Sequence, residues 1–232
     1  MRKYAINIAE ASARMREVLD AKGLLLLADN TLPSVAGLVV GAPIKGSWWA
    51  HPLCHEIYAV SQELQDDPDI AILKLVNAKT TFVHRVLWQD LYTIGTARDP
   101  RQMKSLSPVA KAMLAKIDAR GSARADEVAG RKSLKDVRAD LALLEGRLLV
   151  FTGEEHTETR AHLKRYQTWP NWAKDVGLKP KRAGSAEAAR ARLDKVGAAF
   201  VAGSDAILAF PWSEKPAKRS RAPALTARAR RL

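Results

Sequence analysis

The sequence predicts an α+β fold, and two observations lead to this prediction. Apolar residues recur at helical spacing in several segments. Other segments have the shorter period of strands and are separated by turn residues, as around Asn77-Ala78-Lys79. The charge, which bears on partners and not on the fold, is uneven: residues 1–100 hold 10 basic and 11 acidic side chains, whereas residues 215–232 hold 7 basic and no acidic ones. Helices and strands therefore mix along a chain whose last part is strongly basic.

These patterns divide the chain into four parts. Asp99-Pro100 marks the first boundary, and the prolines and basic residues beyond Trp212 set the last part apart. The parts are a mixed α/β domain at 1–100, a domain of three short helices and a hairpin at 101–182, a helix with an apolar docking segment at 183–212, and a basic tail, expected to be disordered, at 213–232.

In the first domain, helical and strand periods alternate between turn residues. The segment 24–27 is apolar throughout and suits a buried strand or a short helix, while 33–40 is short and apolar. The expected helices cover 6–22, 52–65 and 86–94, and the expected hairpin joins 70–76 to 80–84.

The second domain begins with clear helix boundaries. Ser107 is a suitable N-cap, Pro108 fits the first helical position, and Gly121 ends the segment. Residues 122–124 then suit a minimal strand, and residues 125–129 suit about one helical turn.

The third helix of this domain, expected at 134–145 with Ser133 as its N-cap, is amphipathic. At about 100° per residue, Lys132 and Lys135 point away from the apolar stripe, and Arg138 lies on its flank. We expect these cations and Ser133 to contact DNA, because a helix with basic residues at its N-terminal end suits the major groove. The expected stripe consists of Leu134, Val137, Leu141 and Leu144.

A hairpin is expected after this helix, with a strand at 148–151, a polar connection at 152–159 and a return strand within 160–169. Basic and aromatic residues crowd together on the return strand, which suits phosphate contacts with packing support. Acidic residues in the connection limit how much of the hairpin can face DNA. The expected contacts are Arg160, His162, Lys164 and Arg165, beside Tyr166 and Trp169.

With its helices followed by a basic hairpin, the segment 105–169 resembles the winged helix-turn-helix superfamily. The resemblance implies a module that binds duplex DNA through its third helix and its hairpin. Modules of this kind also serve in protein interaction, so that alternative stays open.

Two further resemblances concern the whole chain. It resembles a group of bacterial proteins, with no assigned activity, that carry the runs Gly46-Ser47-Trp48-Trp49-Ala50-His51-Pro52 and Lys79-Thr80-Thr81-Phe82-Val83-His84-Arg85. It also has a faint similarity to bacterial winged-helix DNA glycosylases, in Ala189-Arg190-Ala191-Arg192-Leu193 and Ala206-Ile207-Leu208-Ala209-Phe210. The sequence lacks the Gln-x-Gln or Gln-x-Asp catalytic motif of that family, so the similarity implies at most a connection to DNA repair.

Composition bounds the class of protein. The 232 residues are 47% hydrophobic, enough for a core, and 38 Lys and Arg against 25 Asp and Glu give a formal charge of +13. This excess suggests a nucleic-acid or other anionic partner. Cys54 is the single cysteine, so no intrachain disulfide is expected and a reducing cytoplasm fits. The N-terminus does not suit a signal peptide, and the longest apolar run, 24–28, is too short to span a membrane.

A short segment after Trp48-Trp49 gathers residue types that do chemistry, namely His51, Cys54, His55 and Glu56. A His-x3-His pair suits zinc, a glutamate suits a base, and a cysteine beside a histidine suits a nucleophile. However, the first histidine precedes a proline, the order is not His-Glu-x-x-His, and only His84 could approach in space as a third ligand. We therefore expect no metal and no cofactor. The alternative of a DNA-processing enzyme with a pocket near 48–56 keeps His51, His55, Glu56 and His84 as catalytic candidates.

Trp48 and Trp49 are adjacent, and in an extended segment they would point in opposite directions. Burial of both tryptophans is the expectation. If one of them is exposed instead, it could stack on an unpaired base.

The leading hypothesis from the sequence is a cytoplasmic protein that binds double-stranded DNA, as a transcription regulator or a DNA-repair accessory. The basic tail, with Lys218, Arg219 and Arg221, is expected to add sequence-independent phosphate contacts. No membrane partner is expected, and the oligomeric state stays open.

Overall fold

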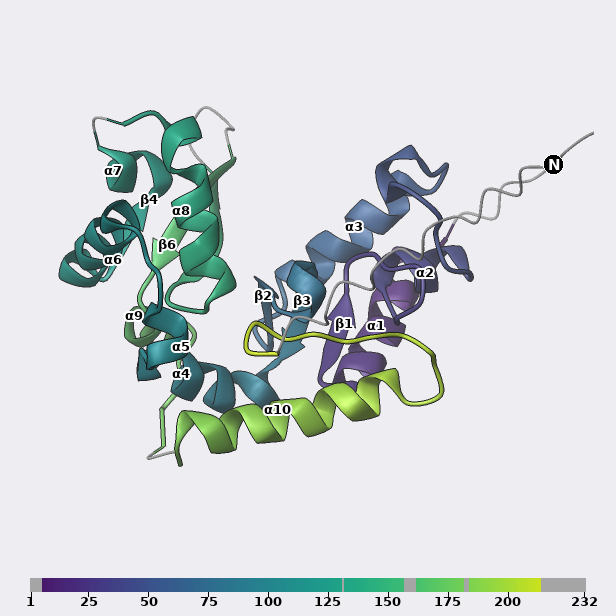
Figure 1. Ribbon diagram of the computed structural model, residues 1–232. Coiled ribbons are helices and arrows are strands. Elements are labelled where there is room, and N and C mark those ends of the chain that lie inside the picture. Colours follow the sequence, from purple (N-terminus) through teal and green to yellow (C-terminus); the bar gives the residue numbers. More distant parts are fainter. Residues whose placement is uncertain (1–5, 131, 157–161, 182–183, 214–232) are drawn as a thin grey trace, which may run out of the picture.

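The structure is a computed structural model that describes residues 6–130, 132–156, 162–181 and 184–213. It is a mixed α+β fold with two small three-stranded antiparallel sheets, which confirms the predicted class. Figure 1 shows one sheet in each of two parts, with α4 (Trp88–Ala97) and α10 (Ala186–Val201) running along their base. Within the described residues, no helix is both long and apolar enough to cross a membrane.

The first sheet has the order β1-β3-β2, formed by Leu24–Leu26, Thr80–His84 and Ile70–Lys74. The predicted hairpin between β2 and β3 is confirmed, and its turn places Asn77 and Ala78 in the left-handed region. Lys74 pairs with Thr80 and His84 with Ile70, so these two basic side chains lie at opposite ends of the hairpin.

Helices cover both faces of this sheet because its side chains alternate between two cores. Leu25 and Phe82 pack toward α1 (Ile8–Lys22), α2 (Val35–Val40) and α3 (Cys54–Gln65). Their neighbours Leu24, Leu26 and Val83 pack on the opposite face, against residues of α4, α9 (Trp169–Asp175) and α10.

The second part forms a separate core from residues between Leu106 and Tyr166. Its sheet has the order β4-β6-β5, so the predicted minimal strand at 122–124 pairs with the return strand of the hairpin. The helix caps at Ser107 and Ser133 are confirmed. The elements are α5 (Pro100–Met103), α6 (Pro108–Arg120), β4 (Ser122–Arg124), α7 (Ala125–Ala129), α8 (Leu134–Gly146), β5 (Phe151–His156) and β6 (His162–Gln167).

The predicted hairpin boundaries were partly wrong. Strand β5 begins at Phe151, because residues 147–150 form a turn and a bend, with Leu148 at a positive φ of 55°. Leu148 belongs to the core that contains Trp169, and Leu149 to the core that contains Tyr166. Strand β6 ends at Gln167, where Thr168 caps the unpredicted helix α9.

Helix α9 joins the two parts. The Trp169 indole N–H donates a 2.6 Å hydrogen bond to the buried Leu148 carbonyl, and Trp172 stacks on Phe151 with 4.9 Å between ring centroids. The segment after α10 also packs on this core, where Phe210 is buried. Short 3-10 helices complete the described fold at Trp48–Ala50, Val76–Ala78 and Arg85–Leu87.

Candidate nucleic-acid interface

Helix α8 buries one face and exposes the other. Val137, Leu141 and Leu144 are buried, as predicted, but Leu134 is 43% exposed, so the predicted stripe is one residue too long. The Ser133 hydroxyl accepts a hydrogen bond from the Asp136 N–H at 3.2 Å and also bonds the Asp136 carboxylate at 2.7 Å. The cap thus occupies the Ser133 side chain, which was expected to contact DNA.

Three cations stand exposed at the start of α8. Lys132, Lys135 and Arg138 are exposed, and no carboxylate of the described residues forms an ion pair with any of them. Among the described side chains of this part, Asp118 pairs with Arg98, Asp126 with Arg124 and Glu145 with Lys164, whereas Asp136 and Asp140 bond the neutral hydroxyls of Ser133 and Ser107 and keep their charge. The three cations at this end of α8 are therefore not held in ion pairs, although Asp136 adds one negative charge in the same turn.

The return strand β6 uses its basic residues differently. Lys164 pairs with the nearly buried Glu145 at 3.1 Å, so this predicted DNA contact serves within the fold. Arg165 is exposed and donates to the Ser122 hydroxyl at 2.5 Å. Burial, together with the Glu145 charge, raises the pKa of Tyr166 to about 12, so this phenol stays neutral under the hairpin.

Other predicted contacts cannot be placed. Arg160, Lys218, Arg219 and Arg221 lie outside the described residues, and His162 is described only as the first backbone position of β6.

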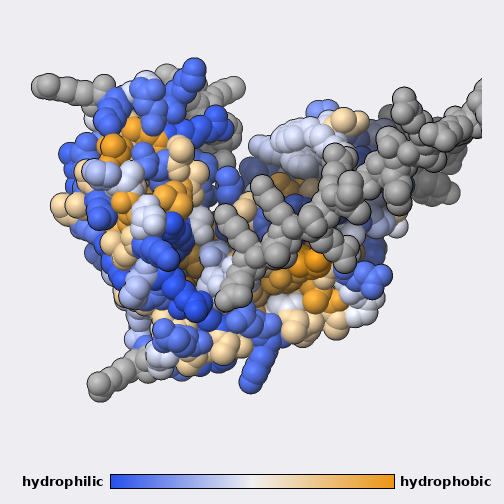
Figure 2. Space-filling model, viewed as in Figure 1, coloured by the Kyte–Doolittle hydropathy of each residue, from blue (hydrophilic) through white to orange (hydrophobic). Residues whose placement is uncertain are grey.

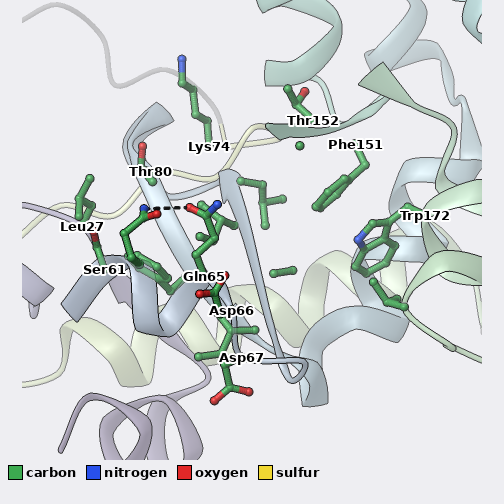
Figure 3. A pocket seen from close by; sticks show the side chains of 18 of the residues that line it. Leu27, Ser61, Gln65, Asp66, Asp67, Lys74, Thr80, Phe151, Thr152 and Trp172 are labelled. Carbon is green, nitrogen blue, oxygen red and sulfur yellow. Dashed lines mark hydrogen bonds between the residues drawn. The ribbon is translucent and has the colours of Figure 1, made fainter. Parts of the chain in front are cut away.

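A cleft of about 710 Å³ lies between the two parts. One wall consists of β2 and the last turns of α3, while the other includes Phe151, Thr152, Lys164 and the buried Trp172. Figure 3 shows Phe151 and Trp172 on the wall across from Gln65 and Asp66. In Figure 2, the surface is hollowed between the parts. The sequence does not reveal this cleft, because its walls come from residues about a hundred positions apart.

The tryptophan pair lines this cleft, and its predicted burial was wrong. The two rings occupy a 3-10 helix, stack at 4.0 Å between centroids with 26° between planes, and do not point in opposite directions. Trp49 is 59% exposed, and the exposed Tyr58 of α3 lies beside it at 5.8 Å. The sequence indicated an exposed aromatic only as an alternative, because an extended backbone was assumed.

The catalytic candidates do not converge. His51 accepts a hydrogen bond from the Leu53 N–H at 3.2 Å before α3, whereas His55 and Glu56 belong to its first turn and line no cleft wall. His84 ends β3, where its Nε2 lies 3.3 Å from Asp20. Among the described residues, His, Cys, Asp and Glu form no group of three or more that could hold a metal ion.

Comparison with known proteins adds no assignment. No protein-family model matches the chain, and no curated protein matches it.

Proposed function

We infer that residues 105–169 form a winged helix that binds duplex DNA through α8 and the β5–β6 hairpin, as part of a transcription regulator or a DNA-repair accessory. The order of elements supports this inference. Helix α6, strand β4, helices α7 and α8 and then a hairpin follow one another, and β4 joins the hairpin by pairing with β6. In such modules, the helix before the hairpin enters the major groove.

The observation that carries the proposal is the group of three exposed cations at the N-terminal end of α8, which form no ion pair with the described residues. The acidic residue of the first turn, Asp136, bonds Ser133 instead, so Lys132, Lys135 and Arg138 are available to phosphates and base edges. The positive end of the helix dipole adds to this attraction. The exposed Leu134 lies among these cations and offers an apolar contact to a thymine methyl group.

Charge reversal at Lys135 tests the proposal. Lys135→Glu should weaken duplex binding about 10-fold at about 100 mM salt, because one phosphate or base contact is worth about 1–3 kcal/mol. Fluorescence anisotropy with a blunt labelled duplex measures the affinity. The fold should survive, since this side chain is exposed and makes no ion pair with the described residues.

Lys195→Glu is the matched control. Lys195 is exposed on α10, away from α8, and makes no ion pair with the described residues. Its replacement by Glu changes the net charge of the protein by the same amount as Lys135→Glu. It should weaken binding far less than Lys135→Glu. Equal effects would assign the binding to net charge alone, and unchanged binding in Lys135→Glu would place the DNA surface elsewhere.

A further inference from the structure

We propose that the cleft between the two parts receives an unpaired nucleotide base, which stacks on Trp49 while α8 holds the adjoining duplex. This inference rests on the proposed function, because the duplex brings the unpaired nucleotide to the cleft. The ligand class is thus a duplex with a single-stranded extension.

The first support is the exposed aromatic surface at the cleft. Trp48 stacks on Trp49 with 4.0 Å between ring centroids, so the Trp49 ring is held on one side although the residue is 59% exposed. Tyr58, 40% exposed, adds a second ring at 5.8 Å. A fixed, exposed indole is a platform for a base, since every base has a flat π face and stacking is tolerant of sequence.

The second support is a row of polar groups beside these rings. Tyr58, Gln62 and Gln65 follow at spacings of four and three residues, so they share one face of α3, and all three line the cleft. The Gln62 amide donates to Gln65 over a long 3.4 Å (dashed line in Figure 3), which leaves most of the donors and acceptors of both amides available. Amides both donate and accept, as base edges require.

Charge in the cleft is compatible with a nucleotide. Two of its carboxylates are paired with cations, Asp67 with Arg16 and Glu145 with Lys164. Two others keep their charge: Asp175, which accepts a hydrogen bond from the neutral Gln167 amide, and Asp66, exposed at the end of α3. Lys74 of β2 is exposed at the cleft and forms no ion pair with the described residues, so it can meet a phosphate.

These features favour a base over an apolar peptide. A peptide that covered the rings with apolar side chains would also desolvate the Gln62 and Gln65 amides and Lys74 without satisfying them. A nucleotide supplies a flat ring, hydrogen-bonding edges and a phosphate together.

Two kinds of probe separate this inference from the proposed function. One is a blunt duplex, and the other is the same duplex with a single-stranded extension of about five nucleotides, made once as a 5′ extension and once as a 3′ extension. The unmodified protein should bind one extended probe about 10-fold more tightly than the blunt probe, the gain expected from one stacked base. Trp49→Ala should remove this preference and leave blunt-duplex affinity unchanged, whereas Trp49→Phe should retain most of it. Lys135→Glu should weaken binding of both probes alike.

Val86→Ala is the matched control, since Val86 is an apolar side chain that is 65% exposed and does not line the cleft. It should leave the preference intact, and unchanged thermal melting of both variants shows that the fold is retained. If blunt and extended probes bind equally, or if Trp49→Ala keeps the preference, the cleft inference is wrong while duplex binding stands. Failure to bind either probe overturns both.

Discussion

The two parts of the molecule use charged residues in different ways. Around the first sheet, several cations pair with carboxylates, as in Arg16–Asp67, Lys79–Asp29 and Arg85–Asp69. At the start of α8 in the second part, three cations have no such pairs among the described residues. The difference shows that overall charge alone does not locate an anion-binding surface. What matters is which cations the fold leaves without carboxylate partners.

The pairs of the first part also differ among themselves. Arg85 and Asp69 are both exposed, and exposed pairs contribute little to stability. Asp29 is instead almost fully buried and accepts hydrogen bonds from Lys79, Thr31 and the Leu32 N–H. Its role is therefore structural.

The largest expected effect comes from the junction that holds the two walls together. A Cβ on Gly95 would lie 2.1 Å from Nε1 of the buried Trp169, which also bonds Leu148. Gly95→Ala should therefore lower the free energy of unfolding by about 3 kcal/mol, as overpacked cores do. Urea denaturation measures this change. In Gly146→Ala the new Cβ meets nothing, so this control should be neutral or slightly stabilising. A cost below about 1 kcal/mol in Gly95→Ala would mean that the junction is loosely packed.

A smaller effect is expected at Asp29. Burial would raise the pKa of this carboxyl, but hydrogen bonds from Lys79 and the 31–32 turn lower it to about 2, from 3.8. Because the pKa is lower in the folded state, this stabilisation is present above about pH 4 and is lost as the pH falls through about 2. Asp29→Asn should cost about 2 kcal/mol at pH 7, and the cost should shrink between about pH 4 and pH 2.

The exposed Asp69→Asn is the control for Asp29→Asn. It should change the free energy of unfolding by less than about 0.5 kcal/mol at any pH in this range. Thermal or urea unfolding at several pH values compares the two. Equal costs for both variants would remove the distinction between the buried pair and the exposed one.

The smallest effect on stability is expected from removing residues 215–232. The measurable change lies in DNA binding, because this segment holds 7 basic and no acidic residues. If roughly half of them neutralise phosphates, deletion should flatten the slope of log affinity against log salt by about 3, at about 0.9 per phosphate. Preference between target sequences should not change. An unchanged slope would leave α8 and the hairpin as the whole DNA surface.

Much of the secondary structure could be predicted from the sequence, because local signals determine it. The caps at Ser107 and Ser133 gave the correct helix starts, and the turn at 77–79 placed the hairpin correctly, although its first strand ends at Lys74 and not at the predicted residue 76. Helix α9 was missed because its tryptophans follow a basic strand without an interruption, although Thr168-Trp169-Pro170 is a good start signal in retrospect.

The candidate sites were harder to predict than the elements. Exposed cations on α8 followed from the helical period. The absence of ion pairs on these cations could not be predicted in this way, since it depends on which cation each neighbouring carboxylate pairs with in the folded protein. The histidines near residues 51–56 were close in sequence, yet a helix start and a helix turn separate their side chains. The cleft arises from contacts between distant segments, which no local pattern encodes.

The covering of the first sheet also has a consequence for synthesis. Leu24, Leu26 and Val83 form one face of that sheet, and much of their cover comes from α9, α10 and Phe210. When residues 1–100 leave the ribosome, this face still lacks that cover, since the covering residues are made roughly a hundred positions later. The nascent chain therefore carries an exposed apolar sheet through most of translation. The second part, whose core lies between Leu106 and Tyr166, can collapse meanwhile. Chaperones that recognise apolar strands should thus bind this protein before release, and ribosome-bound chains ending near residue 180 should capture them more strongly than the released full-length chain.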